Sequence, residues 1–168
     1  NFKMKLNLDK NKIYQIANLV GSDVSLSLTK SNLFVTGKKI TTFKLKNKFN
    51  VLIVFPKILC STKKIYLKNR NFSSYHSIAT SIFNKRETVI NYLINQQNDL
   101  ENTIIRIYPI IGKIINNISI QKGCYFSRVT GSGSACIGLF STLRAAKSAK
   151  KNIKRIFPNY WSNVSKSI

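Results

Sequence analysis

One aspartate stands out among the few carboxylates of this 168-residue chain. The chain contains five acidic residues, and Asp23 follows Gly21 and Ser22, where a helical segment is expected to begin. The first turn of a helix offers unpaired N–H groups and positive potential, which keep a carboxylate ionised. An ionised aspartate beside a substrate hydroxyl can accept its proton during phosphoryl transfer. The alternative interpretation is that Asp23 is a simple helix N-cap.

A second candidate is a glycine–serine segment between two predicted strands, formed by Gly131, Ser132, Gly133 and Ser134. Glycines let backbone N–H groups face an oxyanion without a Cβ in the way, and serines add hydroxyl donors. The segment lacks the lysine and the spacing of a Walker loop, and the chain contains no GxGxxG motif. It therefore predicts either a phosphate-binding loop or an ordinary hairpin turn.

A third candidate is the pair Thr62 and Tyr66, which follows Ser61, a residue type that favours the start of a helix. Residues four positions apart lie on one face of a helix. A hydroxyl and an aromatic ring on that face are suited to hydrogen bonding and to stacking on a nucleobase. Packing of Tyr66 into the core is the alternative.

The three cysteines, Cys60, Cys124 and Cys136, are far apart and form no CxxC pair. This spacing excludes a disulfide framework and a cysteine zinc site, and it suits a reducing cytoplasm. We expect each of them to be a small, buried apolar residue. No metal site is predicted.

The chain is strongly basic, with 28 lysines and arginines against five acidic residues and a net charge of +23. Such a charge is typical of proteins with polyanionic partners. However, lysine, asparagine and isoleucine are abundant together, as in proteins from genomes rich in A and T, and the basic residues are spread over the whole length. We therefore favour compositional drift over nucleic-acid binding. Attraction of an anionic substrate would follow in either case.

The periodicity of apolar residues predicts mixed helices and strands. The predicted elements are helices over 10–20, 22–28, 62–67, 77–83, 86–94, 99–107, 110–118 and 142–156, and strands over 32–37, 40–45, 49–55, 124–129, 135–140 and 157–164. These elements do not alternate strictly, which favours an α+β fold. Hydrophobic residues make up 43% of the chain, enough for a core, and no run approaches the ~18 apolar residues of a membrane span.

The order of these motifs resembles that of the GHMP small-molecule kinases. The similarity is carried by Val20-Gly21-Ser22-Asp23-Val24, by Asn98-Asp99-Leu100-Glu101 and by Thr130-Gly131-Ser132-Gly133-Ser134. It is strongest to those members that phosphorylate the 2-hydroxyl of a cytidine-diphosphate-linked methylerythritol with ATP and Mg²⁺, in the non-mevalonate route to isoprenoids. The resemblance implies a GHMP C-terminal domain, a ferredoxin-like α/β sandwich, over residues 48–168. Residues 1–47 would be the tail of an N-terminal ATP-binding GHMP domain.

The resemblance also implies roles for the candidate residues. Asp23 matches the catalytic aspartate, and Thr62 and Tyr66 match positions that line the cytidine pocket. The segment Gly131–Ser134 matches the glycine loop over the phosphate-transfer region. The implied protein is a cytoplasmic enzyme that is a monomer or a homodimer. We expect no membrane partner, and we do not favour a nucleic-acid partner.

The chain departs from the family pattern in two places and lacks part of it. Ser25 to Ser27 replace the usual Pro and Phe, and Lys57 and Ile58 replace glycines. The serine- and glycine-rich ATP loop lies upstream of this segment in the family, so we expect these 168 residues alone to be inactive. The alternatives are another GHMP kinase, a basic nucleic-acid-binding module and a non-catalytic remnant.

Overall fold

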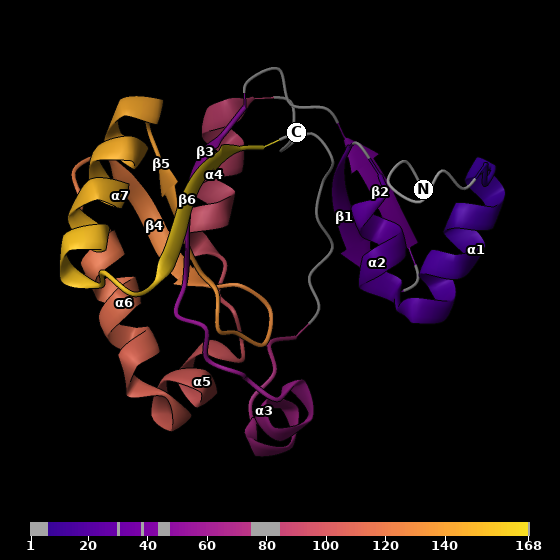
Figure 1. Cartoon of the computed structure of the whole chain (residues 1–168), viewed down its shortest axis with the longest axis horizontal. Helices are drawn as coiled ribbons and strands as arrows, with labels where there is room; N and C mark the ends of the chain where they lie inside the picture. Colours follow the sequence, from indigo (N-terminus) through magenta and orange to yellow (C-terminus); the bar gives the residue numbers. More distant parts are fainter. Residues whose placement is uncertain (1–6, 30, 38, 44–47, 75–84, 168) are drawn as a thin grey trace. The chain divides into compact units, whose positions relative to one another are not determined.

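The chain folds into two compact units, Asn1–Lys44 and Leu45–Ser167 (Figure 1). The computed structural model describes residues 7–29, 31–37, 39–43, 48–74 and 85–167. The predicted helix over 77–83 lies outside these residues.

The first unit contains two helices and a hairpin. Its elements are α1 (Lys10–Val20), α2 (Ser22–Ser27), β1 (Asn32–Thr36) and β2 (Lys39–Phe43). Asp9 caps α1 by accepting the N–H of Lys12 at 2.7 Å. β1 and β2 pair antiparallel, with Asn32 opposite Phe43. The predicted helices and hairpin are confirmed.

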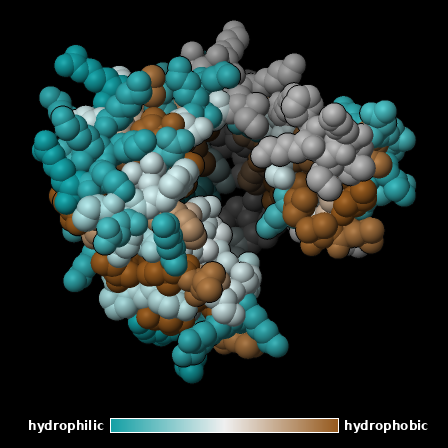
Figure 2. Space-filling view, in the orientation of Figure 1, coloured by the Kyte–Doolittle hydropathy of each residue, from teal (hydrophilic) through white to brown (hydrophobic). Residues whose placement is uncertain are grey.

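The apolar face of α1 is much less covered than its periodicity predicts. Of the expected face, Ala17 is buried, whereas Ile16 is 43% and Val20 is 70% exposed. Within this unit α1 packs against α2, which covers only part of the face. Figure 2 shows hydrophobic colour on the surface of this unit.

The second unit is built on a four-stranded antiparallel sheet. Its strands are β3 (Asn50–Phe55), β4 (Cys124–Val129), β5 (Cys136–Phe140) and β6 (Trp161–Lys166), in the spatial order β4-β5-β3-β6. The first strand of the unit thus lies between its third and its fourth, which is the ferredoxin-like order. The α+β expectation is confirmed.

Five helices complete the second unit. They are α3 (Thr62–Lys68), α4 (Arg86–Asn95), α5 (Glu101–Ile107), α6 (Pro109–Ser119) and α7 (Leu143–Ile156). α6 packs on β4 and β5, and α7 packs on β3, β5 and β6 (Figure 1). The core between them includes Leu52, Val54 and Phe140, all fully buried. None of the described helices has the length and apolar character needed to span a bilayer.

The buried stripe of α7 differs slightly from the expected one. Ala146, Ala149 and Ile153 are at most 1% exposed, but Ile156 is 50% exposed and Ala145 is only half-buried. The spacing of i, i+3 and i+7 centres the stripe on Ala149. Ala145 and Ile156, which the periodicity of the apolar residues would also place on this face, therefore lie at its margins.

Candidate functional site

A single open pocket in the second unit brings several candidate residues together. It has a volume of about 500 Å³, and its lining includes Tyr66, Asn98, Asp99, Arg128 and Gly131. Tyr66 comes from α3, and Gly131 comes from the loop between β4 and β5. The structure therefore places a predicted base-stacking residue and the first glycine of the predicted phosphate loop around the same cavity.

Tyr66 presents an aromatic surface to this pocket. Its side chain is 53% exposed and stacks on Phe72, with ring centroids 6.2 Å apart and an interplanar angle of 23°. The residue that anchors α3 in the core is Ile65, which is fully buried. The core-packing alternative for Tyr66 is therefore wrong, and the ring is free to pack against a planar ligand.

Thr62 connects the same helix to the glycine–serine loop. Its Oγ1 lies 2.8 Å from Oγ of Ser132, and either hydroxyl can donate. Since each hydroxyl has one proton and two lone pairs, one of the two keeps a proton to donate to another group. α3 begins at Thr62 because Ser61 accepts the N–H of Lys64 at 3.3 Å.

The loop itself is a tight hairpin with free amides. The N–H of Thr130 donates to the carbonyl of Ala135 at 2.9 Å. Gly131 has a φ of 55°, a conformation that favours glycine. Within the described residues, the N–H groups of Gly131 and Ser132 donate to no backbone carbonyl. Successive free amides of this kind form a site for an anionic oxygen.

Ser134 has a different part in the loop from the predicted one. It is 3% exposed, and its hydroxyl donates to the carbonyl of Ile58 at 2.7 Å. Because that proton is already used, Ser134 anchors the loop to the segment after β3. Ser132 is the serine whose hydroxyl is better placed to contact a ligand.

Asp23 lies in the first unit, at the second position of α2. The N-cap of this helix is Gly21, and no side chain caps it. Asp23 is exposed, and among the described residues its carboxylate makes no hydrogen bond. The simple N-cap alternative is therefore wrong, and the carboxylate, without a hydrogen-bond partner among the residues that the structure describes, lies in the first turn of α2, where negative charge is favoured.

Arg128 is a pocket residue that the sequence analysis missed. Its Nη2 donates to the carbonyl of Leu93 at 2.6 Å, and its guanidinium lies 4.0 Å from the centroid of the Phe126 ring. Burial lowers the pKa of Arg128, and the nearby charge of Glu101 opposes this shift. Its position three residues before the glycine loop was the available signal.

Comparison with known proteins assigns the fold around this pocket. Residues 89–159 match the sequence model of the family described as GHMP kinases C terminal. This part of the chain is a GHMP kinase C-terminal domain. The match covers α5, α6, α7 and the strands that carry the glycine loop.

The similarity to whole proteins extends over both units. The chain is 34% identical over 169 residues to the 4-diphosphocytidyl-2-C-methyl-D-erythritol kinase of Pelagibacter ubique (strain HTCC1062), covering 99% of this chain and 58% of the relative. It is 31% identical to the protein of that name from Wolbachia pipientis wMel, covering 92% of this chain and 54% of the relative. The chain thus spans little more than half the length of these relatives.

Two solved structures share the fold. A 4-(cytidine 5'-diphospho)-2C-methyl-D-erythritol kinase superposes with a TM-score of 0.69 at 19% identity, covering 98% of this chain and 59% of that one. A homoserine kinase from Cytophaga hutchinsonii gives 0.62 at 13% identity, covering 100% and 60%. At these identities the two structures support the GHMP fold and nothing finer.

The three thiols of the second unit are unsuited to nucleophilic chemistry. Burial raises the pKa of Cys124 to about 11 and that of Cys136 to about 12, and it also raises the pKa of Cys60. A thiol with a pKa this high is protonated near neutral pH. Within the described part of the chain, no three His, Cys, Asp or Glu residues are grouped to hold a metal ion.

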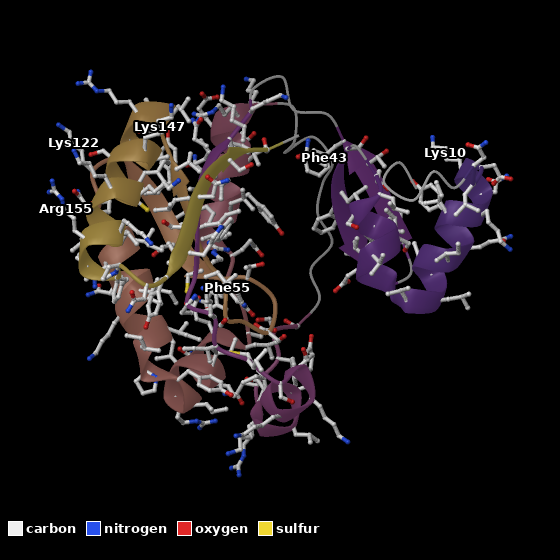
Figure 3. The ribbon with its side chains drawn as sticks, in the orientation of Figure 1. Lys10, Phe43, Phe55, Lys122, Lys147 and Arg155 are labelled. Carbon is white, nitrogen blue, oxygen red and sulfur yellow. The ribbon has the colours of Figure 1, made fainter. Side chains whose placement is uncertain are left out.

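The basic residues of the GHMP domain are densest on the outer face of α7. This face, defined by Lys147, Lys150, Lys151, Lys154 and Arg155, lines a shallow depression. Figure 3 labels Lys147 and Arg155 on α7, and Figure 2 shows hydrophilic colour over this side of the domain. Lys154 Nζ donates to the carbonyls of Pro158 and Tyr160. Cations in the last turn favour a helix C-terminus. A solvated face of an amphipathic helix explains this cluster without a nucleic acid.

The contribution of the Asp99 carboxylate to folding stability is expected to depend on pH. Hydrogen bonds from Ser73, first from its hydroxyl at 2.5 Å and then from its N–H at 2.8 Å, hold the pKa of Asp99 below its usual value. A lowered folded-state pKa stabilises the fold above the unfolded-state pKa, and this contribution is lost as the pH falls through the folded-state pKa.

We therefore expect the stability difference between the wild type and Asp99→Asn to be constant near pH 6 and to shrink below about pH 4. Urea unfolding between pH 6 and pH 3 measures it. Glu87→Gln, which removes an exposed carboxylate from the first turn of α4, is the matched control. A pH-independent difference for Asp99→Asn would contradict the prediction.

Proposed function

We propose that the protein containing this chain phosphorylates the 2-hydroxyl of 4-diphosphocytidyl-2-C-methyl-D-erythritol with ATP. The observation that carries the proposal is the pocket, whose lining includes an exposed aromatic ring and Gly131, the first residue of a loop in which, among the described residues, two successive amides donate to no backbone carbonyl. A cytidine diphosphate needs these two features, a planar surface for its base and donors for its phosphates. The names of the relatives from Pelagibacter and Wolbachia support the same substrate.

The proposed binding roles follow from the chemistry of the pocket. The Tyr66 ring stacks on cytosine, and the Thr62–Ser132 hydroxyl pair supplies a hydrogen-bond donor. The amides of Gly131 and Ser132 bind phosphate oxygens, and the positive charge of Arg128 lies in the same lining. Donors fixed in place before the reaction stabilise the charge that spreads over the transferred phosphoryl group.

Asp23 is the proposed catalytic base. An ionised carboxylate within hydrogen-bonding reach of the substrate alcohol accepts its proton as the oxygen attacks phosphorus. Asp23 suits this role because it is exposed and makes no hydrogen bond among the described residues.

ATP and Mg²⁺ belong to this proposal through the resemblance. Magnesium is usually held by one or two carboxylates together with substrate phosphates, and the described residues contain no larger cluster of ligands. We further propose that residues 1–47 are the end of the ATP-binding domain and 48–168 the C-terminal domain. A cytoplasmic enzyme, monomeric or homodimeric, is part of the same proposal.

Replacing Tyr66 tests the cytidine pocket directly. Tyr66→Ala in the full-length protein is expected to weaken binding of CDP about tenfold or more, because stacking of a base on an aromatic ring contributes about 1–3 kcal/mol. Tyr66→Phe keeps the ring and is expected to bind as the wild type does. Isothermal titration calorimetry with CDP measures both.

Two results of this experiment would count against the proposal. Equal CDP affinity in the wild type and Tyr66→Ala would remove Tyr66 from the base site. A wild-type protein that phosphorylates another small alcohol and does not bind CDP would favour a different GHMP kinase.

A further inference from the structure

The N-terminal segment of α5 holds the glycine loop by its backbone. We call residues 98–103 the α5 turn. Asn98 Nδ2 donates to the carbonyls of Val129 at 3.0 Å and Gly131 at 2.8 Å. Glu101 Oε2 accepts the N–H of Val129 at 2.7 Å. Two side chains therefore fix the backbone at the point where β4 ends and the loop begins.

These bonds pair backbone groups on the open edge of β4, where a further strand would otherwise pair. β4 is an outer strand of the sheet and pairs with β5 alone. An edge strand leaves N–H and C=O groups without a ladder partner. At Val129 both groups are taken by the α5 turn, the N–H by Glu101 and the carbonyl by Asn98. The additional bond from Asn98 to Gly131 extends this support beyond the strand into the loop.

The same turn holds the aromatic wall of the pocket. Asp99 accepts both the N–H and the hydroxyl of Ser73, the residue after Phe72. Thr103 Oγ1 donates to Oδ1 of Asn69 at 2.8 Å, and Asn69 is the C-cap of α3. These contacts fix both ends of the segment that stacks Phe72 on the Tyr66 ring.

The α5 turn is itself rigidly placed. Leu100 and Thr103 are 5% exposed and Ile104 is fully buried in the core. Asn98 Oδ1 accepts the N–H of Leu100 at 3.1 Å, which orients its amide nitrogen toward the loop. The turn is therefore a fixed support to which two otherwise separate pocket walls are attached.

We propose that the α5 turn positions the two halves of the pocket independently. Asn98 and Glu101 set the geometry of the glycine loop for phosphoryl transfer, whereas Asp99 and Thr103 hold the wall for the nucleobase. This inference rests on the proposed kinase function. It assigns these four side chains as positioning residues because their hydrogen bonds to other segments of the chain go to the start of the glycine loop and to residues 69–73; Asn98 and Asp99 also line the pocket.

The side chains that hold the glycine loop and those that hold the nucleobase wall are expected to affect the kinetics differently. Asn98→Asp removes both amide donors and places a carboxylate against two carbonyls, while it keeps the acceptor for the N–H of Leu100. We expect kcat of the full-length enzyme to fall at least about tenfold, and KM for the cytidylyl substrate to rise by a smaller factor, because the same loop amides contact its phosphates. Asp99→Asn is expected to raise that KM several-fold with little change in kcat.

Matched variants separate positioning from general destabilisation. Asn102→Asp makes the same chemical change at an exposed site of α5 and is expected to leave both constants unchanged. Glu101→Gln keeps the shape of the side chain and an acceptor oxygen but weakens the charge-assisted hydrogen bond from the N–H of Val129. We therefore expect a smaller fall in kcat than for Asn98→Asp. Glu87→Gln is the control for Glu101→Gln. Similar falls in kcat and similar rises in KM for Asn98→Asp and Asp99→Asn would overturn the inference.

Hydrogen–deuterium exchange tests the support without any need for activity. Asn98→Asp and Glu101→Gln are expected to speed exchange of peptides covering 128–134, and Asp99→Asn that of peptides covering 69–74. Unchanged exchange at 128–134 in both loop variants would overturn the inference. A wild-type enzyme without kinase activity would refute the proposed function and the kinetic roles, while faster exchange would still establish the structural support.

Discussion

Asp23→Asn is expected to lower kcat of the full-length enzyme by about 10²–10⁴-fold, the usual contribution of a general base. The substitution keeps the size of the side chain but removes its ability to accept the substrate proton. Because Asp23 caps no helix and makes no hydrogen bond among the described residues, stability and substrate affinity should change little. Single-turnover measurements with ATP and the cytidylylated substrate give the rate, and thermal unfolding gives the stability.

Glu87→Gln is the control for Asp23→Asn, because Glu87 is likewise an exposed carboxylate in the first turn of a helix. It should retain full activity. A loss of less than about fivefold in Asp23→Asn would remove this residue from the chemistry, since a catalytic base contributes at least about 10². In that case the proposal for the pocket of the GHMP domain would be unaffected, but the base would have to be another group.

Gly133→Ala is expected to lower kcat about 100-fold and to destabilise the fold by about 1–3 kcal/mol. Gly133 has a φ of 87°, which L side chains rarely adopt. An added Cβ would lie 3.2 Å from Sγ of Cys60 and 3.5 Å from the fully buried Ile104. The contact with Cys60 is tighter than usual and the one with Ile104 is ordinary, so the strained backbone and the close thiol together are expected to shift the loop from the position that its amides need. Turnover and urea unfolding measure the two effects.

The control for Gly133→Ala is Gly37→Ala, at a hairpin turn in the first unit. Gly37 has a φ of 56° and no atom within 4 Å of an added Cβ, so this variant carries the backbone penalty without the crowding. It should lose stability but keep its kcat. Adding Cys60→Ala to Gly133→Ala should recover part of the activity, because it removes the closer contact. Equal kcat losses at Gly37 and Gly133 would show that the loop geometry is unimportant for turnover.

Several elements were predictable because their signals lie within a few residues. Asp9, Ser61 and Thr142 each cap a helix by accepting an N–H three residues ahead, at Lys12, Lys64 and Ala145. The β1–β2 hairpin and the short strand β3 likewise follow from local alternation and from the turn at Gly37. The predictions that failed concern which residues of α1 and α7 are buried. Periodicity predicts the apolar face of a helix, but the neighbouring elements determine how much of that face is covered.

The amino-acid sequence by itself determined which residue types were available for chemistry, the helix starts and turns that carry them, and the kinase family that their order resembles. Only the tertiary structure decided that Tyr66 is exposed, that Ser134 is committed to Ile58, and that Arg128 lines the pocket. Likewise, the bonds from Asn98 and Glu101 to the loop join residues about thirty positions apart. The physical reason is range: a cap depends on the next few residues, whereas burial and backbone support depend on which distant segments the sheet and helices bring together.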